Sequence, residues 1–358
     1  MMRLPHFQYH APRTVREAAD LLAASPATTR LVAGGTDLLP NMKRRQQNPA
    51  TLIGLRQIAE LKRITTGAQK RETTTLEEST GDGLTIGAGA TLTDLVRDAR
   101  VHDAYRALWQ AAAQVATPHL RNMGTIGGNL CLDTRCNYYD QSYEWRKAID
   151  FCLKKDGGTC WVAPSSTMCL AVSSTDTAPA LLALDASVTL VSAAETRRIA
   201  VSDLYVNDGI HYLTRRPTEI LTLIQLPRLD GWRSTYWKLR RRGAFDFPVL
   251  SVAAAVKLAA DGTAEAARII LGAVASRPIE APEAAASLIG APLTDDTIAR
   301  AADLAAKPAK PMDNTDFALV WRKRVTRDIV TCALRELRGD DVQALRRRIA
   351  RQELIFIR

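Results

Sequence analysis

The chain has 358 residues, of which 46% are hydrophobic, 24% charged and 6% aromatic, and its formal net charge is +10. This length allows two domains with hydrophobic cores, and the ordinary fractions of glycine, proline and charged residues exclude disorder and fibrous repeats. No apolar run approaches the roughly 20 residues of a membrane-spanning helix, and the first residues lack the apolar stretch of a signal peptide. We therefore expect a cytoplasmic protein with no membrane partner.

The positive charge raises the question of nucleic-acid binding. Arginine triplets at 240–242 and 346–348 could neutralise phosphates. Aromatic residues do not alternate with these triplets as stacking platforms would, and the second triplet lies in a segment with the charge pattern of a solvated helix. We expect no nucleic-acid partner, because an acidic protein or an anionic substrate fits the charge better.

The N-terminal segment is predicted to form a helix, a strand and a glycine turn. Thr14 opens a capping-box pattern ahead of apolar residues at helical spacing. A β-prone run at 29–33 leads into Gly34-Gly35-Thr36-Asp37, whose last two residues can cap a helix that begins at Leu38. This arrangement directs backbone N–H groups outward and suits an anion such as a diphosphate, although an ordinary tight turn accounts for the motif equally well.

Two short strands, 52–55 and 84–90, are predicted on either side of a polar, exposed loop at 65–83. The second strand carries two glycines that resemble the start of a dinucleotide fingerprint. Leu92 holds the position of the third glycine, so a Rossmann site is rejected. The helices expected next are one capped by Thr91 and one over 102–115.

A second glycine turn, Thr125-Ile126-Gly127-Gly128-Asn129, leads into a cysteine-rich segment. The segment holds Cys131, Cys136, Cys152, Cys160 and Cys169, and the sixth cysteine, Cys332, is isolated. Disulfides are not expected in a cytoplasmic chain, and zinc sites usually pair their ligands as Cys-x2–4-Cys, which no pair after Cys136 does. Four thiolates from separate turns can hold a bulky iron–sulfur cubane. Such a cluster would order a long loop whose sequence has little apolar periodicity. An iron–sulfur cluster is therefore favoured, zinc stays the alternative, and Cys131 is the surplus candidate.

The second half is predicted to form strands and then helices, which indicates an α+β C-terminal domain. Residues 231–243 are polar, basic and bounded by glycines, so we expect a domain boundary there. The predicted strands are 187–192, 220–226, 247–258 and 267–274, and the predicted helices are 282–290, 294–306 and 316–337.

Several runs together resemble the FAD-binding subunit of the xanthine dehydrogenase and carbon monoxide dehydrogenase family. Residues 33–40 and 121–129 are similar to its two flavin loops, 176–186 to the strand that follows, and 245–248 and 272–278 to signature runs of its C-terminal domain. The resemblance implies an α+β protein: a two-lobed FAD-binding domain of the vanillyl-alcohol oxidase (PCMH) type, then a smaller α+β CO dehydrogenase flavoprotein C-terminal domain. The implied boundaries are 1–230, with an iron–sulfur loop inserted at 131–171, then 231–340 and a basic tail at 341–358.

The resemblance also implies which residues bind FAD. Asp176 is expected at the ribityl or sugar hydroxyls, Leu221 against the flavin and Lys238 near its pyrimidine side. Plain strand core is an equal alternative for Leu221, and a surface charge is the alternative for Lys238. No nucleophile arrangement is found, so no catalytic residue is expected. The expected cofactor-binding residues are Val32, Ala33, Gly34, Gly35, Thr36, Asp37, Thr117, Thr125, Ile126, Gly127, Gly128, Asn129, Asp176, Leu221 and Lys238.

The cysteine-rich segment is similar to that of 4-hydroxybenzoyl-CoA reductase, whose flavin subunit carries an additional [4Fe–4S] cluster in this loop. The resemblance assigns the cluster ligands to Cys136, Cys152, Cys160 and Cys169. A bacterial molybdenum aldehyde oxidoreductase has a related insertion and is the alternative. There a His-Ala pair typically precedes the next strand, whereas this chain has Ala-Val-Ser-Ser-Thr-Asp at 171–176, which favours the reductase.

The resemblance implies an oxidoreductase subunit that relays electrons and does not itself convert the substrate. Reduced ferredoxin would deliver electrons to the [4Fe–4S] cluster, FAD would receive them, and a [2Fe–2S] small subunit would carry them to molybdopterin in a large subunit. There 4-hydroxybenzoyl-CoA would become benzoyl-CoA in aromatic catabolism, and the expected assembly is a dimer of heterotrimers. Two other classes remain: a flavoprotein oxidase acting alone, which leaves the cysteines without a purpose, and a zinc-stapled binding protein.

Overall fold

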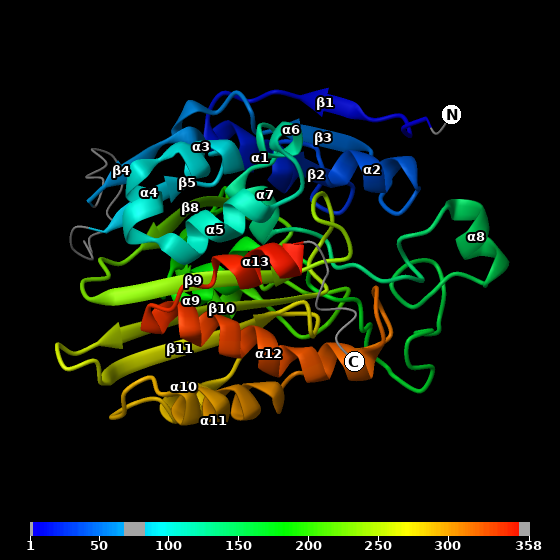
Figure 1. Cartoon of the computed structure of the whole chain (residues 1–358). Helices are drawn as coiled ribbons and strands as arrows, with labels where there is room; N and C mark the ends of the chain where they lie inside the picture. Colours follow the sequence, from blue (N-terminus) through cyan, green and yellow to red (C-terminus); the bar gives the residue numbers. More distant parts are fainter. Residues whose placement is uncertain (1–2, 68–82, 351–358) are drawn as a thin grey trace.

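A computed structural model of the chain describes residues 3–67 and 83–350 (Figure 1). The predicted loop at 65–83 lies outside these residues except at its ends, and so does the end of the predicted tail, 351–358. In the described part, none of the helices combines the length and the apolar composition that crossing a bilayer requires.

The first lobe is a small parallel sheet with one long helix packed on it. The strand order is β1–β3–β2, and the helix α1 begins where the hydroxyl of Thr14 accepts from the amide of Glu17 at 3.1 Å. Val15 and Leu22 of α1 face the sheet and pack around Ile53. The elements of this lobe are β1 (Gln8–His10), α1 (Val15–Ala24), β2 (Thr29–Val32), α2 (Leu38–Lys43), β3 (Thr51–Gly54) and the 3-10 turn η1 (Ala59–Lys62).

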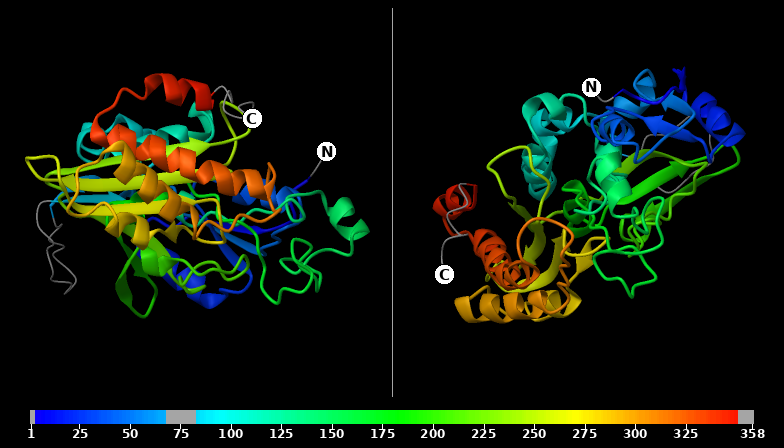
Figure 2. Two further views of the ribbon diagram at one scale, coloured as in Figure 1. Left: turned by 60° about the horizontal axis from the view of Figure 1, so that its bottom comes forward. Right: turned by 90° about the vertical axis from the view of Figure 1, so that its right-hand side faces the viewer.

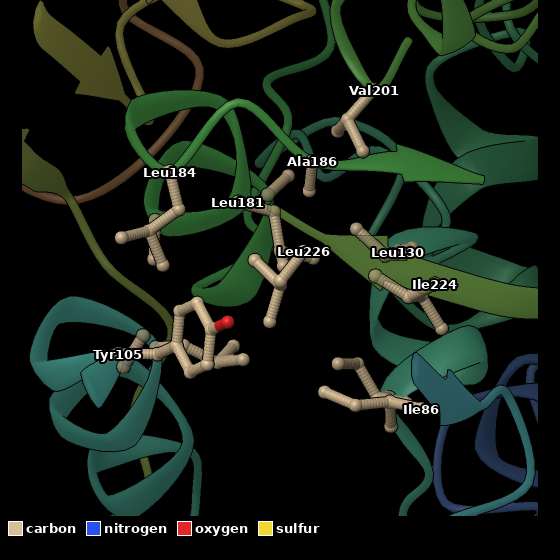
Figure 3. Packing of buried hydrophobic residues seen from close by; sticks show 14 of the residues in the cluster. Ile86, Tyr105, Leu130, Leu181, Leu184, Ala186, Val201, Ile224 and Leu226 are labelled. Carbon is tan, nitrogen blue, oxygen red and sulfur yellow. The ribbon is translucent and has the colours of Figure 1, made fainter. Parts of the chain in front are cut away.

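The second lobe is an antiparallel sheet in the order β4–β5–β8–β6–β7, covered by helices. Its strands are β4 (Ile64–Thr66), β5 (Leu84–Gly87), β6 (Ser187–Val191), β7 (Thr196–Ala200) and β8 (Ile220–Leu226). Its helical elements are α3 (Leu92–Arg97), α4 (Ala99–Ala104), α5 (Arg106–Gln114), α6 (Pro118–Arg121), α7 (Ile126–Leu130), α9 (Thr177–Ala183) and η2 (Ser202–Leu204). Figure 3 shows Ile86, Ile224 and Leu226 of the sheet gathered with Leu130 of α7 and Leu181 of α9 in the core.

The C-terminal domain is an antiparallel sheet in the order β12–β11–β10–β9, buried on both faces. Alternate residues of β10 enter different cores: Ala253 and Ala255 pack with the second lobe, and Val252 and Val256 with the C-terminal helices. Figures 1 and 2 show α10, α11 and α12 on the face of this sheet away from α5 and α9. The elements are β9 (Trp232–Leu239), β10 (Leu250–Leu258), β11 (Ala264–Gly272), β12 (Ile279–Glu280), α10 (Pro282–Ala286), α11 (Asp295–Ala306), α12 (Leu319–Arg338) and α13 (Gln343–Ala350).

This architecture confirms the predicted fold class, an α+β protein with a two-lobed domain followed by a smaller α+β domain, and corrects three local predictions. The run 176–186, predicted as a strand, forms α9, which is buried on nearly every side between α5, α7 and the C-terminal sheet, so it lacks an amphipathic pattern. The polar stretch 231–243, in which a domain boundary is predicted, contains β9 of the C-terminal sheet, and the residues of β9 from Thr235 to Leu239 are buried. The helix predicted over 102–115 is interrupted at Tyr105. Asp37 stands at the start of α2 but makes no side-chain capping bond.

A buried polar cluster joins the second lobe to the C-terminal domain. Asp176, at the start of α9, accepts from the Tyr236 hydroxyl at 2.6 Å and from Lys238 Nζ at 3.0 Å, and both partners lie on β9. Lys238 also donates to the carbonyl of Gln114 in α5 at 3.1 Å. Burial raises the pKa of Asp176 and lowers the pKa of Lys238, and their mutual attraction opposes both shifts. The pair therefore tolerates its dry position only as long as both members are present.

Removing one member of this pair should destabilise the protein in a pH-dependent way. We expect Lys238→Met to lower the free energy of unfolding by about 3–5 kcal/mol near pH 8, because it leaves a buried, unpaired carboxylate. The pKa of Asp176 is higher in the folded state than in the unfolded state. The free-energy cost of burying its ionised carboxylate is therefore absent at a pH below the unfolded-state pKa, and it grows as the pH rises through the folded-state pKa. The deficit relative to wild type should therefore shrink toward about pH 5, as measured by denaturant unfolding.

The matched control is Lys257→Met, which breaks an exposed pair with Glu265 and should cost at most about 1 kcal/mol. The double variant Asp176→Asn/Lys238→Met should recover most of the lost stability. Equal losses for Lys238→Met and Lys257→Met would contradict the interpretation.

Candidate functional site

The two glycine turns lie against each other with no side chain between them. A Cβ added to Gly34 would stand 1.9 Å from the carbonyl oxygen of Met123, just before the second turn. In the second turn, a Cβ on Gly127 would stand 2.7 Å from the Cβ of Ala88, at the end of β5. Glycine is therefore required at both positions for steric reasons, and the turns predicted from sequence come together in space.

The touching turns leave backbone donors without partners. Among the described residues, the amides of Gly34, Gly35 and Thr36 in the first turn and of Thr125 in the second donate no hydrogen bond within the chain. Neighbouring N–H groups of this kind form a concave site for an anion. The two turns thus fit the diphosphate of a dinucleotide such as FAD, as the sequence predicts, without any cationic side chain.

The threonines and the asparagine predicted near the cofactor have structural bonds of their own. Thr117 caps α6 by accepting from Leu120 N at 3.4 Å, and Thr125 caps α7 by accepting from Gly128 N at 3.1 Å. Asn129 Oδ1 accepts from Thr175 Oγ1 at 2.9 Å and from the amide and hydroxyl of Thr177 at 3.1 and 2.7 Å. Asn129 therefore fastens the second turn to α9, and its oxygen is fully engaged.

The remaining predicted cofactor residues are less closely grouped. Val32 ends β2 and Ala33 follows it directly into the first turn, while Ile126 is buried at the start of α7. Leu221 in β8 is 5% exposed and packs in the main core, which agrees with its alternative as a core residue. Asp176 and Lys238, predicted at different parts of the flavin, form an ion pair with each other.

Arg135 connects the first glycine turn with the cysteine segment. Its guanidinium forms an ion pair with Asp37, which is why that carboxylate does not cap α2, and donates to Asn41 Oδ1 at 3.1 Å. It also lies 4.8 Å from the ring centre of Phe247 in the C-terminal domain. Burial lowers the pKa of Arg135, whereas the Asp140 carboxylate raises it. Because Arg135 immediately precedes Cys136, its ion pair with Asp37 links the predicted flavin loop directly to the first of the four predicted metal ligands.

The cysteine segment leaves and rejoins the body at one point. Arg135 and Val172 exchange backbone hydrogen bonds of 2.8 and 2.7 Å, which closes the base of the excursion. Beyond the base the segment consists of turns and a single helix, α8 (Tyr143–Ala148), capped by Ser142. Figures 1 and 2 show α8 at the far end of this excursion, away from the three sheets.

The four predicted metal ligands surround one small cavity. Cys136, Cys152, Cys160 and Cys169 all line it and are each 4–7% exposed. Burial raises the pKa of Cys136 to about 12 and that of Cys169 to about 11, and the neighbouring thiols add to both shifts. Tyr139 and Ala171 pack with these thiols and exclude water. Removing the protons of Cys136 and Cys169 therefore requires a compensating positive charge.

The spacing of these thiols does not suit a single metal ion. In the part of the chain that the structure describes, no three His, Cys, Asp or Glu residues are close enough to hold one ion, which disfavours the zinc alternative. All six cysteines are described, and none forms a disulfide. Cys131 lies outside the cavity beside Tyr205 and Arg215, and Cys332 lies in the C-terminal core. A polynuclear cluster differs from a single ion in that it can take its four thiolates from separate turns.

Sequence reasoning missed three residues around this cavity, Gly209, Lys154 and Asp133. Gly209 donates its amide to Cys169 O at 2.8 Å, and a Cβ on it would stand 2.6 Å from Cys169 Sγ. It is far from the cysteines in the sequence, so no local signal could have found it. Lys154 and Asp133 form a buried ion pair at 2.8 Å and read in the sequence as ordinary loop charges.

Comparison with known proteins identifies the family and the fold of the chain. Residues 5–229 match the family described as the FAD binding domain in molybdopterin dehydrogenase, and residues 234–337 match the CO dehydrogenase flavoprotein C-terminal domain. The chain is 33% identical over 335 residues to the aldehyde oxidoreductase FAD-binding subunit PaoB of Escherichia coli K12, covering 90% of this chain and 97% of that one. It is 29% identical over 295 residues to the nicotinate dehydrogenase FAD-subunit of Eubacterium barkeri, covering 82% of each.

A solved structure shares the fold. Carbon monoxide dehydrogenase from Hydrogenophaga pseudoflava, in a form that lacks the Mo-pyranopterin moiety of its cofactor, superposes with a TM-score of 0.73 at 26% identity, covering 94% of this chain and 98% of that one. The predicted family resemblance is therefore confirmed, and so are the two predicted domain types. This chain belongs to the FAD-binding subunits of the xanthine dehydrogenase and carbon monoxide dehydrogenase family.

Proposed function

We propose that this chain is an electron-relay subunit that carries a [4Fe–4S] cluster in addition to FAD. The observation that supports the proposal is the convergence of Cys136, Cys152, Cys160 and Cys169 on one buried cavity in a chain of this family. When bound, such a cluster supplies one-electron transfer, and FAD supplies both one- and two-electron chemistry. The need for free thiols favours a reducing compartment, the cytoplasm.

The chain's own residues would divide the work of binding. The free amides of Gly34, Gly35, Thr36 and Thr125 would hold the FAD diphosphate. The four cysteines would hold the cluster once deprotonated, and Tyr139 would keep water from it. Arg135, paired with Asp37, would hold the FAD and the cluster at a fixed distance from each other.

The domains proposed are 1–230 with the insertion 131–171, then 231–340, and finally the tail 341–358.

We propose that the chain works with a molybdopterin-binding large subunit and a [2Fe–2S] small subunit, as a dimer of heterotrimers. Two observations support different substrates for the large subunit. The sequence at 171–176 and the cysteine pattern favour 4-hydroxybenzoyl-CoA, which would take two electrons and two protons to give benzoyl-CoA and water, with ferredoxin as donor. The identity of 33% across 90% of the chain to an aldehyde oxidoreductase subunit favours the second candidate, aldehyde oxidation.

The cluster ligands can be tested by metal content. Anaerobically purified wild-type protein should contain about four iron atoms per chain and show broad absorption that dithionite bleaches. Replacing any of Cys136, Cys152, Cys160 or Cys169 with Ser should remove most of this iron. The matched controls Cys131→Ser and Cys332→Ser, both outside the cavity, should retain it. Zinc in the wild type, or iron loss in the controls as well, would overturn the assignment.

The role of the first glycine turn in FAD binding can be tested with a glycine-to-alanine substitution, which adds one methyl group. Gly34→Ala places a Cβ against the carbonyl of Met123, so the two turns must separate. We expect FAD affinity, measured by fluorescence titration of the apoprotein, to fall at least about tenfold, or about 1.4 kcal/mol. The matched control is Gly158→Ala, whose Cβ meets no atom within 4 Å and should leave affinity unchanged. An unaltered affinity in Gly34→Ala would exclude this loop from the binding site.

The substrate can be identified with the assembled complex. The complex, purified anaerobically through a tag on this chain, is expected to convert 4-hydroxybenzoyl-CoA to benzoyl-CoA when supplied with reduced ferredoxin. The control is an aromatic aldehyde with an electron acceptor and no reductant. Carboxylic acid formation from the aldehyde, without benzoyl-CoA formation, would select the second candidate and reverse the direction of electron flow.

A further inference from the structure

Lys154 is a buried cation at the wall of the cysteine cavity. It follows Cys152 by two residues, lines the cavity, and its side chain is 6% exposed. Its ammonium group donates to Asp133 Oδ1 at 2.8 Å, Thr134 Oγ1 at 2.6 Å and Gly209 O at 2.6 Å. These three acceptors use the three donors of a lysine, so the charge is fixed in position.

The surroundings of Lys154 hold the charge in a dry, rigid environment. The nitrogen lies 4.8 Å from the ring centre of Tyr139 and 5.5 Å from that of Tyr212. Asp133 is 8% exposed, and its second oxygen accepts from Tyr139 and Gln47, both at 3.2 Å. A buried pair of this kind contributes little net stability compared with apolar residues of similar size. The position of the charge therefore points to a role beyond folding.

Lys154 reaches the cysteines through Gly209. The carbonyl of Gly209 accepts from Lys154, and its amide donates to the carbonyl of Cys169. Because Gly209 has no side chain, its backbone can lie directly against Cys169 Sγ. The next residue, Lys155, differs: it is 36% exposed and pairs with Asp156 at 3.0 Å.

We propose that Lys154 is a positioning residue that raises the reduction potential of the cluster, an inference that rests on the proposed function. A cluster held by four thiolates is anionic, and reduction adds one more negative charge. A fixed cation behind Cys169, in surroundings of low dielectric, stabilises the more negative state. The negative charge of Asp133 has the opposite effect. The reduction potential of the wild-type cluster therefore lies between that of a chain without the Lys154 charge and that of a chain without the Asp133 charge.

The test is an EPR-monitored redox titration of the purified chain. At the potential that half-reduces the wild-type cluster, Lys154→Met should be at least about tenfold less reduced, which corresponds to about 59 mV for one electron. Asp133→Asn should be more reduced than the wild type. The matched control Lys155→Met, one residue along and paired at the surface, should stay within about twofold. Shifts of opposite sign in the two variants could not come from general loosening of the loop.

The outcomes separate this inference from the proposed function. A wild-type chain without iron would overturn the proposed function itself. Loaded clusters with equal potentials in Lys154→Met and Lys155→Met would overturn the role of Lys154 alone. If Lys154→Met does not load a cluster, the proposal is tested with Asp133→Asn alone. A cluster in Asp133→Asn that is no more reduced than the wild-type cluster contradicts the proposal. Lys154→Arg, which keeps the charge, should load and titrate like the wild type.

Discussion

The structure depends on a place where two backbone turns touch without side chains. Gly34 packs against the carbonyl of Met123, and Gly127 packs against Ala88. This contact brings the small parallel sheet of the first lobe to the larger sheet of the second. It also brings near each other two turns whose amides at Gly34, Gly35, Thr36 and Thr125 donate no hydrogen bond within the described chain. One steric requirement thus joins the lobes and shapes the proposed flavin-binding site.

Two buried charged contacts then fix the other parts to this centre. Asp176 and Lys238 join α9 to β9, so the C-terminal sheet is held against the second lobe. Arg135 joins the first glycine turn to the base of the cysteine segment and reaches Phe247 of the C-terminal domain. Burial makes each contact intolerant of losing one partner. Their shared effect is to hold elements from distant parts of the chain in fixed relative positions around the two proposed redox centres.

The cysteine segment shows how a long excursion can be ordered from within. It has one short helix, and its base is closed by the Arg135–Val172 bridge. Four buried thiols and the fixed pair of Lys154 and Asp133 occupy its interior. Burial raises the pKa of Cys136 and Cys169, so a nearby positive charge such as a metal centre would favour their deprotonation. In the proposed function, assembly of the cluster would therefore be coupled to ordering of the segment, as metal binding is coupled to folding in small metal-binding domains.

The sequence by itself determined the features that depend on local chemistry. The caps at Thr14 and Thr91, the two glycine turns and most strands follow from near neighbours, and the family follows from motifs in order. Only tertiary structure decided that the run 176–186 contains a helix, α9 at Thr177–Ala183, and that 231–243 contains a buried strand. Packing on nearly every side removes the alternation of polar and apolar residues from which a helix or strand is predicted. Tertiary structure also decided that Asp37 binds Arg135 and that Gly209 lies behind Cys169, since contacts between distant segments leave no local signal.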